Sequence, residues 1–336
     1  MINYEASDSP SAFFANVEQE EVFTVGDMYN RWGNTLKLRL LTNQGGLKKR
    51  IVNSELDRPG LALSGYIERF AYRRIQILGQ TEMSFLYSLP PEKQRQAVYN
   101  IVRFPAVPCI IVCKKLHVPS KILEVANSQG TAILQSELST VDLQDQLQKH
   151  LEFIFAKQIL IHGAMVDVYG VGMLITGDAG VGKSECALDL VERGHRFVAD
   201  DVVVVKKLQL NTVTAFANSR IKHYMEIRGL GIINVKDLFG IWAVRTQKDV
   251  DIVMNLFRWD GMSNMDRANV DHKVQMILDV PIRKISIPVT SGKNMTVISE
   301  VIAMNFLREK IEGISTSDEF SKNLTRNMEH QRAMQW

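Results

Sequence analysis

Gly177-Asp178-Ala179-Gly180-Val181-Gly182-Lys183-Ser184 is the stretch of this 336-residue sequence that decides the fold. It fills every fixed position of the pattern G-x-x-x-x-G-K-[ST], in which backbone N–H groups surround a phosphate. Residues 172–176 before it predict a strand, and residues 185–193 after it predict a helix that ends at Gly194. The motif needs this order of strand, loop and helix, because the helix N-terminus adds positive potential at the phosphate. We refer to residues 177–184 as the phosphate loop.

The phosphate loop predicts bound ATP, with Lys183 on the β- and γ-phosphates and the Ser184 hydroxyl on Mg²⁺. By itself the loop indicates only that a nucleotide is bound. An ATPase, a GTPase switch and a kinase all use it, so the groups that accompany the loop decide the chemistry.

Asp200 and Asp201 follow the apolar residues 197–199 and precede a predicted strand at 202–205. Two adjacent carboxylates between apolar runs are unusual, because burying charge is unfavourable unless it serves a metal, a partner or a reaction. In isolation such a pair is a loop turn about as often as a site. Shortly after a phosphate-loop lysine, it fits the metal carboxylate or general base that phosphoryl transfer requires.

The residues alone leave two interpretations for each of several other positions. Glu226 and Arg228 stand beside two glycines, where they form either a metal and phosphate site or a surface ion pair on a turn. Arg267 lies in the polar segment 260–272 and either closes over a phosphate or is a solvated side chain. His162 lies one predicted strand before the phosphate loop, although a lone histidine is usually structural.

The distribution of apolar and polar residues along the chain predicts two α/β domains between two polar ends. Residues 1–20 lack a sustained period and predict a flexible extension. Residues 21–148 alternate strands (36–41, 75–78, 109–112, 132–134) with helices (90–102, 120–128), which is typical of a mostly parallel sheet. A helix at 141–157 leads into a P-loop catalytic domain, 149–314. That domain ends in a helix at 294–310, and residues 315–336 form a polar tail. The apolar residues on or near one face of this helix are Met295, Ile298, Val301, Ile302 and Leu307.

Net charge, hydrophobicity and cysteine content limit the classes of protein to which the chain can belong. The net charge of +3 gives no support for a nucleic-acid-coating surface, and no apolar run approaches the roughly 20 residues of a membrane helix. The first residues show no secretory signal, and the sparse cysteines suit the cytoplasm. Cys109, Cys113 and His117 are evenly spaced, but on a strand they lie too far apart to share a metal, so buried cysteines are expected.

With these residues in place, the chain resembles the bacterial HPr kinase/phosphorylase family, which phosphorylates and dephosphorylates a serine of the phosphocarrier protein HPr. The resemblance covers residues 20–310 and rests on the phosphate loop and on the stretches 162–163, 166–170, 193–195, 199–201, 226–234, 58–66 and 74–79. The stretch 226–234 is close to family-specific. The resemblance implies a C-terminal P-loop kinase domain similar to phosphoenolpyruvate carboxykinases.

The resemblance also implies the roles of particular residues. It implies that residues 177–184 bind ATP and that Ser184 and Glu226 bind Mg²⁺. The other catalytic positions that it implies are His162, Lys183 and Arg267. Asp201 becomes the general base of phosphorylation and the general acid of the reverse step, since microscopic reversibility lets one carboxylate serve both. In the reverse step inorganic phosphate attacks phosphoserine and pyrophosphate is released. The family further implies HPr as partner, pyrophosphate as an alternative donor, and a homohexamer.

One segment departs from the family pattern. Where the family has a proline-valine-arginine-proline-glycine-arginine run tied to dephosphorylation, this chain has Pro288-Val289-Thr290-Ser291-Gly292-Lys293. One positive charge is missing, and lysine cannot make the bidentate phosphate contact of arginine. We expect weaker or altered phosphorylase activity with the kinase activity intact.

Two other classes of function stay open: a P-loop kinase of a small metabolite, and a non-catalytic regulator that senses ATP. Asp201 separates the regulator from a kinase, because a sensor needs no base beside the γ-phosphate. The sequence lacks the His-Arg-Asp and Asp-Phe-Gly signatures, which excludes the mechanism of eukaryotic-type protein kinases.

Overall fold

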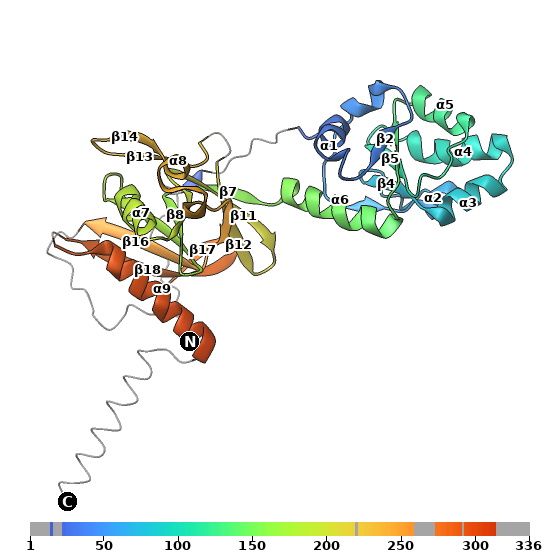
Figure 1. Cartoon of the computed structure of the whole chain (residues 1–336). Helices are drawn as coiled ribbons and strands as arrows, with labels where there is room; N and C mark the ends of the chain where they lie inside the picture. The colour runs from blue at the N-terminus through green and yellow to red at the C-terminus, as the bar shows by residue number, and fades with distance from the viewer. Residues whose placement is uncertain (1–13, 16–21, 219–220, 259–272, 291, 314–336) are drawn as a thin grey trace, which may run out of the picture. The chain divides into compact units, whose positions relative to one another are not determined.

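The computed structural model describes residues 14–15, 22–218, 221–258, 273–290 and 292–313. The chain divides into two compact units, one formed by residues 18–156 and the other by residues 1–17 and 157–336 (Figure 1). The division lies later than the expected 148/149, because one continuous helix, α6 (Thr140–Phe155), runs through that position. Leu143, Leu147 and Leu151 of α6 are buried in a core of the N-terminal unit.

The N-terminal unit is built on a single sheet with the strand order β2-β6-β5-β4-β3. Strands β3 to β6 are parallel neighbours and β2 is antiparallel to β6, which confirms the mostly parallel sheet. The strand bounds are β2 Leu38–Leu40, β3 Leu56–Asp57, β4 Ile75–Leu78, β5 Cys109–Val112 and β6 Ala132–Ser136. All three cysteines of the chain are free and buried.

Helices cover both faces of this sheet. One core joins the sheet to α1 (Val25–Trp32) and α6, and a second core joins it to the other helices (Figure 1). Those are α2 Gly60–Leu63, α3 Gln80–Ser88, α4 Pro91–Val102 and α5 Ser120–Ser128, and a short 3-10 helix η2 spans Gln44–Lys48. The helices α4 and α5 match the sequence expectation closely. The sequence pattern did not indicate α1 and α3.

The C-terminal unit contains two larger sheets and a separate hairpin. The first sheet, β10-β8-β9-β16-β18-β17, is mixed, with β16 parallel to both β9 and β18. The second, β1-β7-β11-β12-β15, is antiparallel throughout. The strands are β1 Phe14–Ala15, β7 Gln158–His162, β8 Ala164–Val168, β9 Val171–Gly177, β10 Arg196–Ala199, β11 Val202–Gln209, β12 Thr212–Ala217, β15 Gln247–Asp249, β16 Ile252–Arg258, β17 Val274–Ile277 and β18 Val280–Val289.

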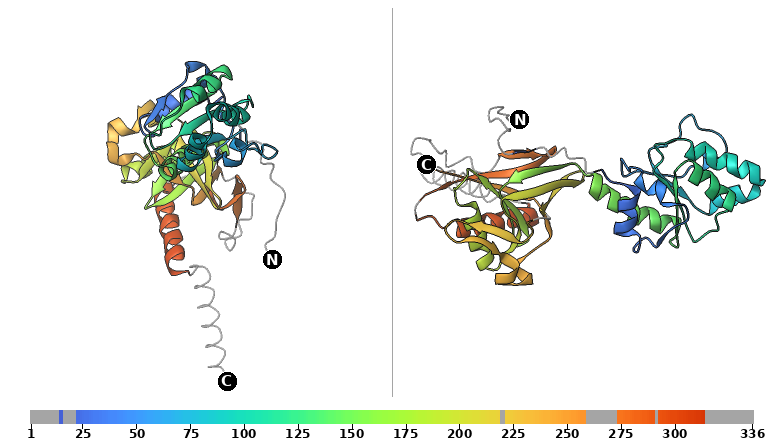
Figure 2. Two further views of the ribbon diagram at one scale, coloured as in Figure 1. Left: turned by 90° about the vertical axis from the view of Figure 1, so that its right-hand side faces the viewer. Right: turned by 90° about the horizontal axis from the view of Figure 1, so that it is seen from above.

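This unit has three layers: the second sheet, the first sheet and a layer of helices. A core that includes Ile161, Leu174, Val203 and Val253 joins the two sheets face to face. The opposite face of the first sheet packs through a second core against α7 (Lys183–Glu192) and α9 (Met295–Glu312). Figure 2 shows these sheets on one side of the unit and the helices on the other. The hairpin β13 (Tyr224–Ile227) and β14 (Gly231–Asn234) continues into α8 (Val235–Phe239) and the 3-10 helix η3 (Ile241–Ala243).

Two sequence expectations change at the ends of the chain. Phe14 and Ala15, within the expected loose extension, form β1 and pair with Ile161 and Leu160. The buried positions of α9 are Thr296, Ser299, Glu300 and Ala303. Met295, Ile298, Ile302 and Leu307 pack partly buried against the same core, as expected, whereas Val301 is exposed. The tail at 315–336 lies outside the described residues. Within the residues that are described, no helix is long and apolar enough to span a membrane.

Candidate phosphoryl-transfer site

The phosphate loop connects the central strand β9 to the N-terminus of α7, as the sequence predicts. Its turns require glycine, because Gly177, Gly180 and Gly182 have φ of 136°, 71° and 106°. At Gly180 there is a second constraint: a Cβ atom would lie 2.6 Å from an Nη atom of Arg228. At Gly182, where α7 begins, no other atom lies within 4 Å of a Cβ position, so the loop is open to a ligand on that side.

Lys183 lies across the phosphate loop. Its Nζ donates hydrogen bonds of 2.9 Å to the carbonyl oxygens of both Gly177 and Asp178, and the side chain is buried. Burial lowers the pKa of the Lys183 ammonium, while Asp200 and other nearby carboxylates oppose that shift. These contacts hold the cation at the loop, where the motif places the β- and γ-phosphates.

Asp200 is buried directly beside the loop. Its Oδ1 accepts a hydrogen bond of 3.1 Å from the Ser184 hydroxyl, and its Oδ2 is a buried oxygen without a hydrogen-bond partner among the described residues. Burial raises the pKa of the Asp200 carboxyl to about 6, against a lowering by the Ser184 hydrogen bond and by the backbone N–H groups of Asp201 and Glu226, which lie near the carboxyl without reaching hydrogen-bond geometry at Oδ2. An unpaired buried carboxylate oxygen is costly, which points to a cation as its missing partner.

Asp201 and His162 come together through strand pairing. His162 ends β7 and pairs with Val202 of β11, so the residue before β11 lies next to the imidazole. His162 Nδ1 is 3.1 Å from Asp201 Oδ1 and 2.9 Å from the Asp201 carbonyl oxygen. Asp201 has φ +64°, a left-handed conformation that aspartate tolerates better than most residues. Its side chain is 61% exposed, so its carboxylate can reach an incoming group.

A cleft of about 420 Å³ gathers these groups. We name it the phosphate cleft; its walls include His162, Lys183, Ser184, Asp200, Asp201, Glu226 and Arg228. Glu226 lies on β13, opposite Ile232 of β14, so the hairpin supplies one wall. The structure thus brings the sequence-predicted residues of the described region to one place. Arg267 lies outside the described residues.

Arg258 is a candidate that the sequence analysis missed. It ends β16, and its Nη2 donates a hydrogen bond of 3.1 Å to the Gly180 carbonyl oxygen of the phosphate loop. Arg228 also lies close to Gly180, so two guanidinium groups stand at this residue of the loop. A terminal strand arginine in an unremarkable sequence context carries no motif, so only the parallel pairing of β16 with β9 reveals its place.

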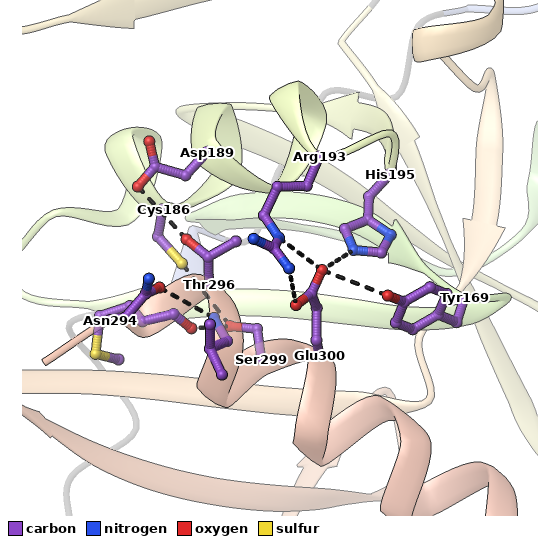
Figure 3. Close-up of polar contacts among 11 residues, drawn as sticks. Tyr169, Cys186, Asp189, Arg193, His195, Asn294, Thr296, Ser299 and Glu300 are labelled. Carbon is purple, nitrogen blue, oxygen red and sulfur yellow. Dashed lines mark hydrogen bonds and ion pairs between the residues drawn. The ribbon is translucent and has the colours of Figure 1, made fainter.

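An ion cluster around the buried Glu300 anchors the C-terminal end of α7 to α9 (Figure 3). The Glu300 carboxylate accepts two hydrogen bonds of 2.8 Å from Arg193, and it also contacts His195 Nε2 at 3.1 Å and the Tyr169 hydroxyl at 3.4 Å. The Arg193 hydrogen bond lowers the pKa of Glu300. The cluster fixes the helix that begins at the phosphate loop.

We expect Glu300→Gln to lower the unfolding temperature at pH 7 by about 2–4 °C, the shift that about 1 kcal/mol produces in a domain of this size. A lowered folded-state pKa means that the stabilisation is present above the ordinary pKa of 4.5 and is lost as the pH falls through the folded value. The difference in unfolding temperature between the wild type and Glu300→Gln should therefore be smaller at pH 3.5 than at pH 7. An equal gap at both pH values would contradict the assignment.

The fold and the site together define a P-loop phosphotransferase. Two family models match the chain: the HPr serine kinase N terminus over residues 23–151, and the HPr serine kinase C-terminal domain over residues 154–324. The chain belongs to the HPr serine kinase family, a family of ATP-using protein-serine kinases and phosphatases. Among solved structures it is similar to the Hpr(Ser) kinase/phosphatase from Coxiella burnetii, with 34% identity over 48% of this chain and 97% of that one, and a TM-score of 0.43.

Proposed function

We propose that the protein transfers the γ-phosphoryl group of ATP to a serine of an HPr-type phosphocarrier protein, and that it also catalyses the reverse phosphorolysis. The observation that carries the proposal is the exposed Asp201 carboxylate, held by His162 in the same cleft as the phosphate loop. A regulator that only senses ATP needs no such group. Membership of the HPr serine kinase family is the reason for naming an HPr-type protein as the acceptor.

In the forward reaction the acceptor serine Oγ attacks the γ-phosphorus and the bond to the β–γ bridging oxygen breaks. Asp201 takes the serine proton, and His162 orients its carboxylate. Lys183 and Arg228 stabilise the charge that spreads over the phosphate oxygens. In reverse, inorganic phosphate attacks phosphoserine, pyrophosphate is released, and Asp201 returns the proton to the serine oxygen. Pyrophosphate can then serve as donor in place of ATP by the same path.

The residues of the phosphate cleft fit a bound Mg²⁺. Ser184 and Glu226 are the ligands that the family resemblance assigns, and the unpaired Oδ2 makes Asp200 a third candidate. Hydroxyl and carboxylate oxygens are hard ligands, and Mg²⁺ in kinases is held by one or two carboxylates together with phosphate oxygens. When bound, the ion neutralises charge on the phosphates. Asp200 also holds the Ser184 hydroxyl at the N-terminus of α7.

The rim of the cleft favours a protein acceptor over a small metabolite. The hairpin that carries Glu226 also carries two large apolar side chains that are mostly exposed, Leu230 at 69% and Ile232 at 73%. Exposed apolar surface of this kind marks protein contacts, whereas a metabolite kinase encloses its substrate. We assign this surface to the carrier protein.

Further features of the family belong to the proposal. We propose that the protein acts as a homohexamer in the cytoplasm, where ATP and the carrier protein are available. We also propose that catalysis is confined to the second of the two domains expected from the sequence, 21–148 and 149–314, between the extension 1–20 and the tail 315–336; in the structure α6 remains whole and the boundary lies at 156/157.

The decisive experiment is phosphotransfer from radiolabelled ATP and Mg²⁺ to purified HPr, followed by mapping of the modified residue. We expect label on one serine of HPr. Label that appears in a small molecule without any protein acceptor would instead identify a metabolite kinase. Bound ATP without any transfer would identify a regulator.

We expect the phosphorolysis rate to be well below the kinase rate, because Lys293 stands where the family run ends in arginine. Lys293 Nζ is engaged with the Pro288 carbonyl oxygen at 3.4 Å; Ser291 lies outside the described residues. Pyrophosphate release from phosphorylated HPr measures this directly. The variant Lys293→Arg should raise that rate several-fold with the kinase rate unchanged. A wild-type reverse rate equal to the forward rate would refute the expectation.

A further inference from the structure

A second hollow, of about 770 Å³, borders the phosphate loop. We name it the side pocket. It is lined by one face of α7, by the ends of β16 and β18, and by residues 292–296 at the start of α9. Glu185, Asp189 and Glu192 mark that face of α7, since residues four and three apart lie on one side of a helix. Figure 3 shows Asp189 and Thr296 facing each other between the two helices, with their side-chain oxygens 3.5 Å apart.

The position of the side pocket in the sheet is that of a ligand site. The strands β9, β16 and β18 are parallel neighbours, and their carboxyl ends lie at the same edge, with Leu256 opposite Gly177 and Arg258 opposite Val289. Ligands of α/β sheets bind outside the carboxyl ends of the strands. The phosphate loop leaves β9 at this edge, and the side pocket opens beside it over β16 and β18.

The side pocket adjoins the phosphate cleft, because Gly182 and Glu185 line both. The γ-phosphate must lie in the cleft, beside Asp201. That cleft must also admit the acceptor serine and a metal ion, so the other end of an extended nucleotide has to leave it. We propose that the side pocket holds the adenosine moiety of ATP. This inference rests on the proposed function, in that ATP is the donor.

The lining of the side pocket suits a nucleoside. Val181, Leu256 and Val289 offer apolar contacts to a flat base, and the volume lies within the range of about 300–1,000 Å³ of ligand pockets. Asp189 and Glu192 place exposed carboxylates on the α7 wall. A carboxylate is the usual acceptor for ribose hydroxyls. With Glu185, the lining holds three carboxylates against the two cations Arg193 and Lys293, and Arg193 is paired with Glu300, so the pocket suits the uncharged end of the nucleotide and the loop takes the phosphates.

A bulky substitution in the pocket tests the proposal by separating nucleoside from phosphate binding. We expect Asp189→Trp to weaken ADP binding at least about tenfold in calorimetric titrations with Mg²⁺. Binding of inorganic pyrophosphate, which has no nucleoside, should change less than about twofold. Val301→Trp is the matched control, because Val301 is exposed on α9 and does not line the pocket. Unchanged ADP affinity in Asp189→Trp, or an equal loss for both ligands, would overturn the proposal.

A second variant gives an independent readout without a bulky side chain. The double variant Asp189→Asn/Glu192→Gln should lose the preference of the wild type for ADP over 2′,3′-dideoxy-ADP, by about tenfold, because hydrogen bonds to charged acceptors are lost. A preference that persists in full would also overturn the proposal. Wild-type protein that binds ADP in this way but fails to phosphorylate HPr would refute the proposed function and leave the side pocket standing.

Discussion

Asp201→Asn is expected to lower the rate of phosphotransfer to HPr by a factor of roughly 10²–10⁴, the range that a general base contributes. This corresponds to about 3–5 kcal/mol of transition-state stabilisation. Asparagine has the same shape as aspartate but cannot accept the serine proton at neutral pH. Positioning of ATP by the phosphate loop and by Lys183 remains in the variant, which leaves a residual rate above zero.

The Asp201 substitution is a clean test because of its backbone conformation. Asp201 has φ +64°, and asparagine is one of the few residues that adopt this left-handed region readily. Alanine at the same position would add backbone strain to the loss of the carboxylate. Asparagine also retains an oxygen that can contact His162. The variant should therefore fold as the wild type does, with unfolding temperatures that agree within error.

Both directions of the reaction should fall together in Asp201→Asn, because the same carboxylate serves both. Single-turnover transfer to HPr and pyrophosphate release from phosphorylated HPr are the two measurements, and ADP affinity is the control. His162→Asn offers a graded comparison, since it removes only the group that orients the carboxylate. Full transfer by Asp201→Asn would remove Asp201 from the mechanism.

The phosphate loop shows how much a local pattern can establish. Its glycines, Lys183 and the flanking apolar runs interact within a few residues, so the order of strand, loop and helix was predicted and is confirmed in β9 and α7. The same holds for the alternating strands and helices of the N-terminal unit. Their buried runs are short and continuous, as parallel strands covered on both faces should be.

Features that depend on long-range pairing could not be predicted in this way. Asp200 and Asp201 are neighbours in sequence, yet one is buried against Ser184 and the other is exposed beside His162, because the pairing of β7 with β11 places Asp201 next to the imidazole. Arg258 reaches Gly180 through the pairing of β16 with β9. Glu300 looks like a surface residue of an apolar helix until Arg193 is placed beside it.

Asp200→Asn is expected to stabilise the metal-free protein at high pH. Without metal, the wild type holds a buried carboxylate whose Oδ2 lacks a hydrogen-bond partner among the described residues. Its folded-state pKa is about 6, above the ordinary 3.8, so the folded protein binds this proton more tightly than the unfolded chain does. Stability is therefore lost as the pH rises from about 4 to about 6, and the loss is complete above that. At pH 8 the neutral variant should be more stable by on the order of 1–3 kcal/mol.

Mg²⁺ should reverse that order. A ligand that binds only the folded state stabilises it by about 2.7 kcal/mol at a concentration one hundred times its Kd, and Asp200→Asn lacks one proposed ligand of the ion. Denaturant unfolding of both proteins at pH 8, with Mg²⁺ and with a chelator, gives the four free energies of unfolding to be compared. At pH 5 without metal, the difference in stability between the two proteins should be smaller. Glu185→Gln is the matched control, because this exposed carboxylate lines the same cleft but is not assigned to the ion. If Mg²⁺ stabilised Asp200→Asn as much as the wild type, the buried oxygen would need a partner other than the metal, and the phosphate cleft would have to bind its cation through Ser184 and Glu226 alone.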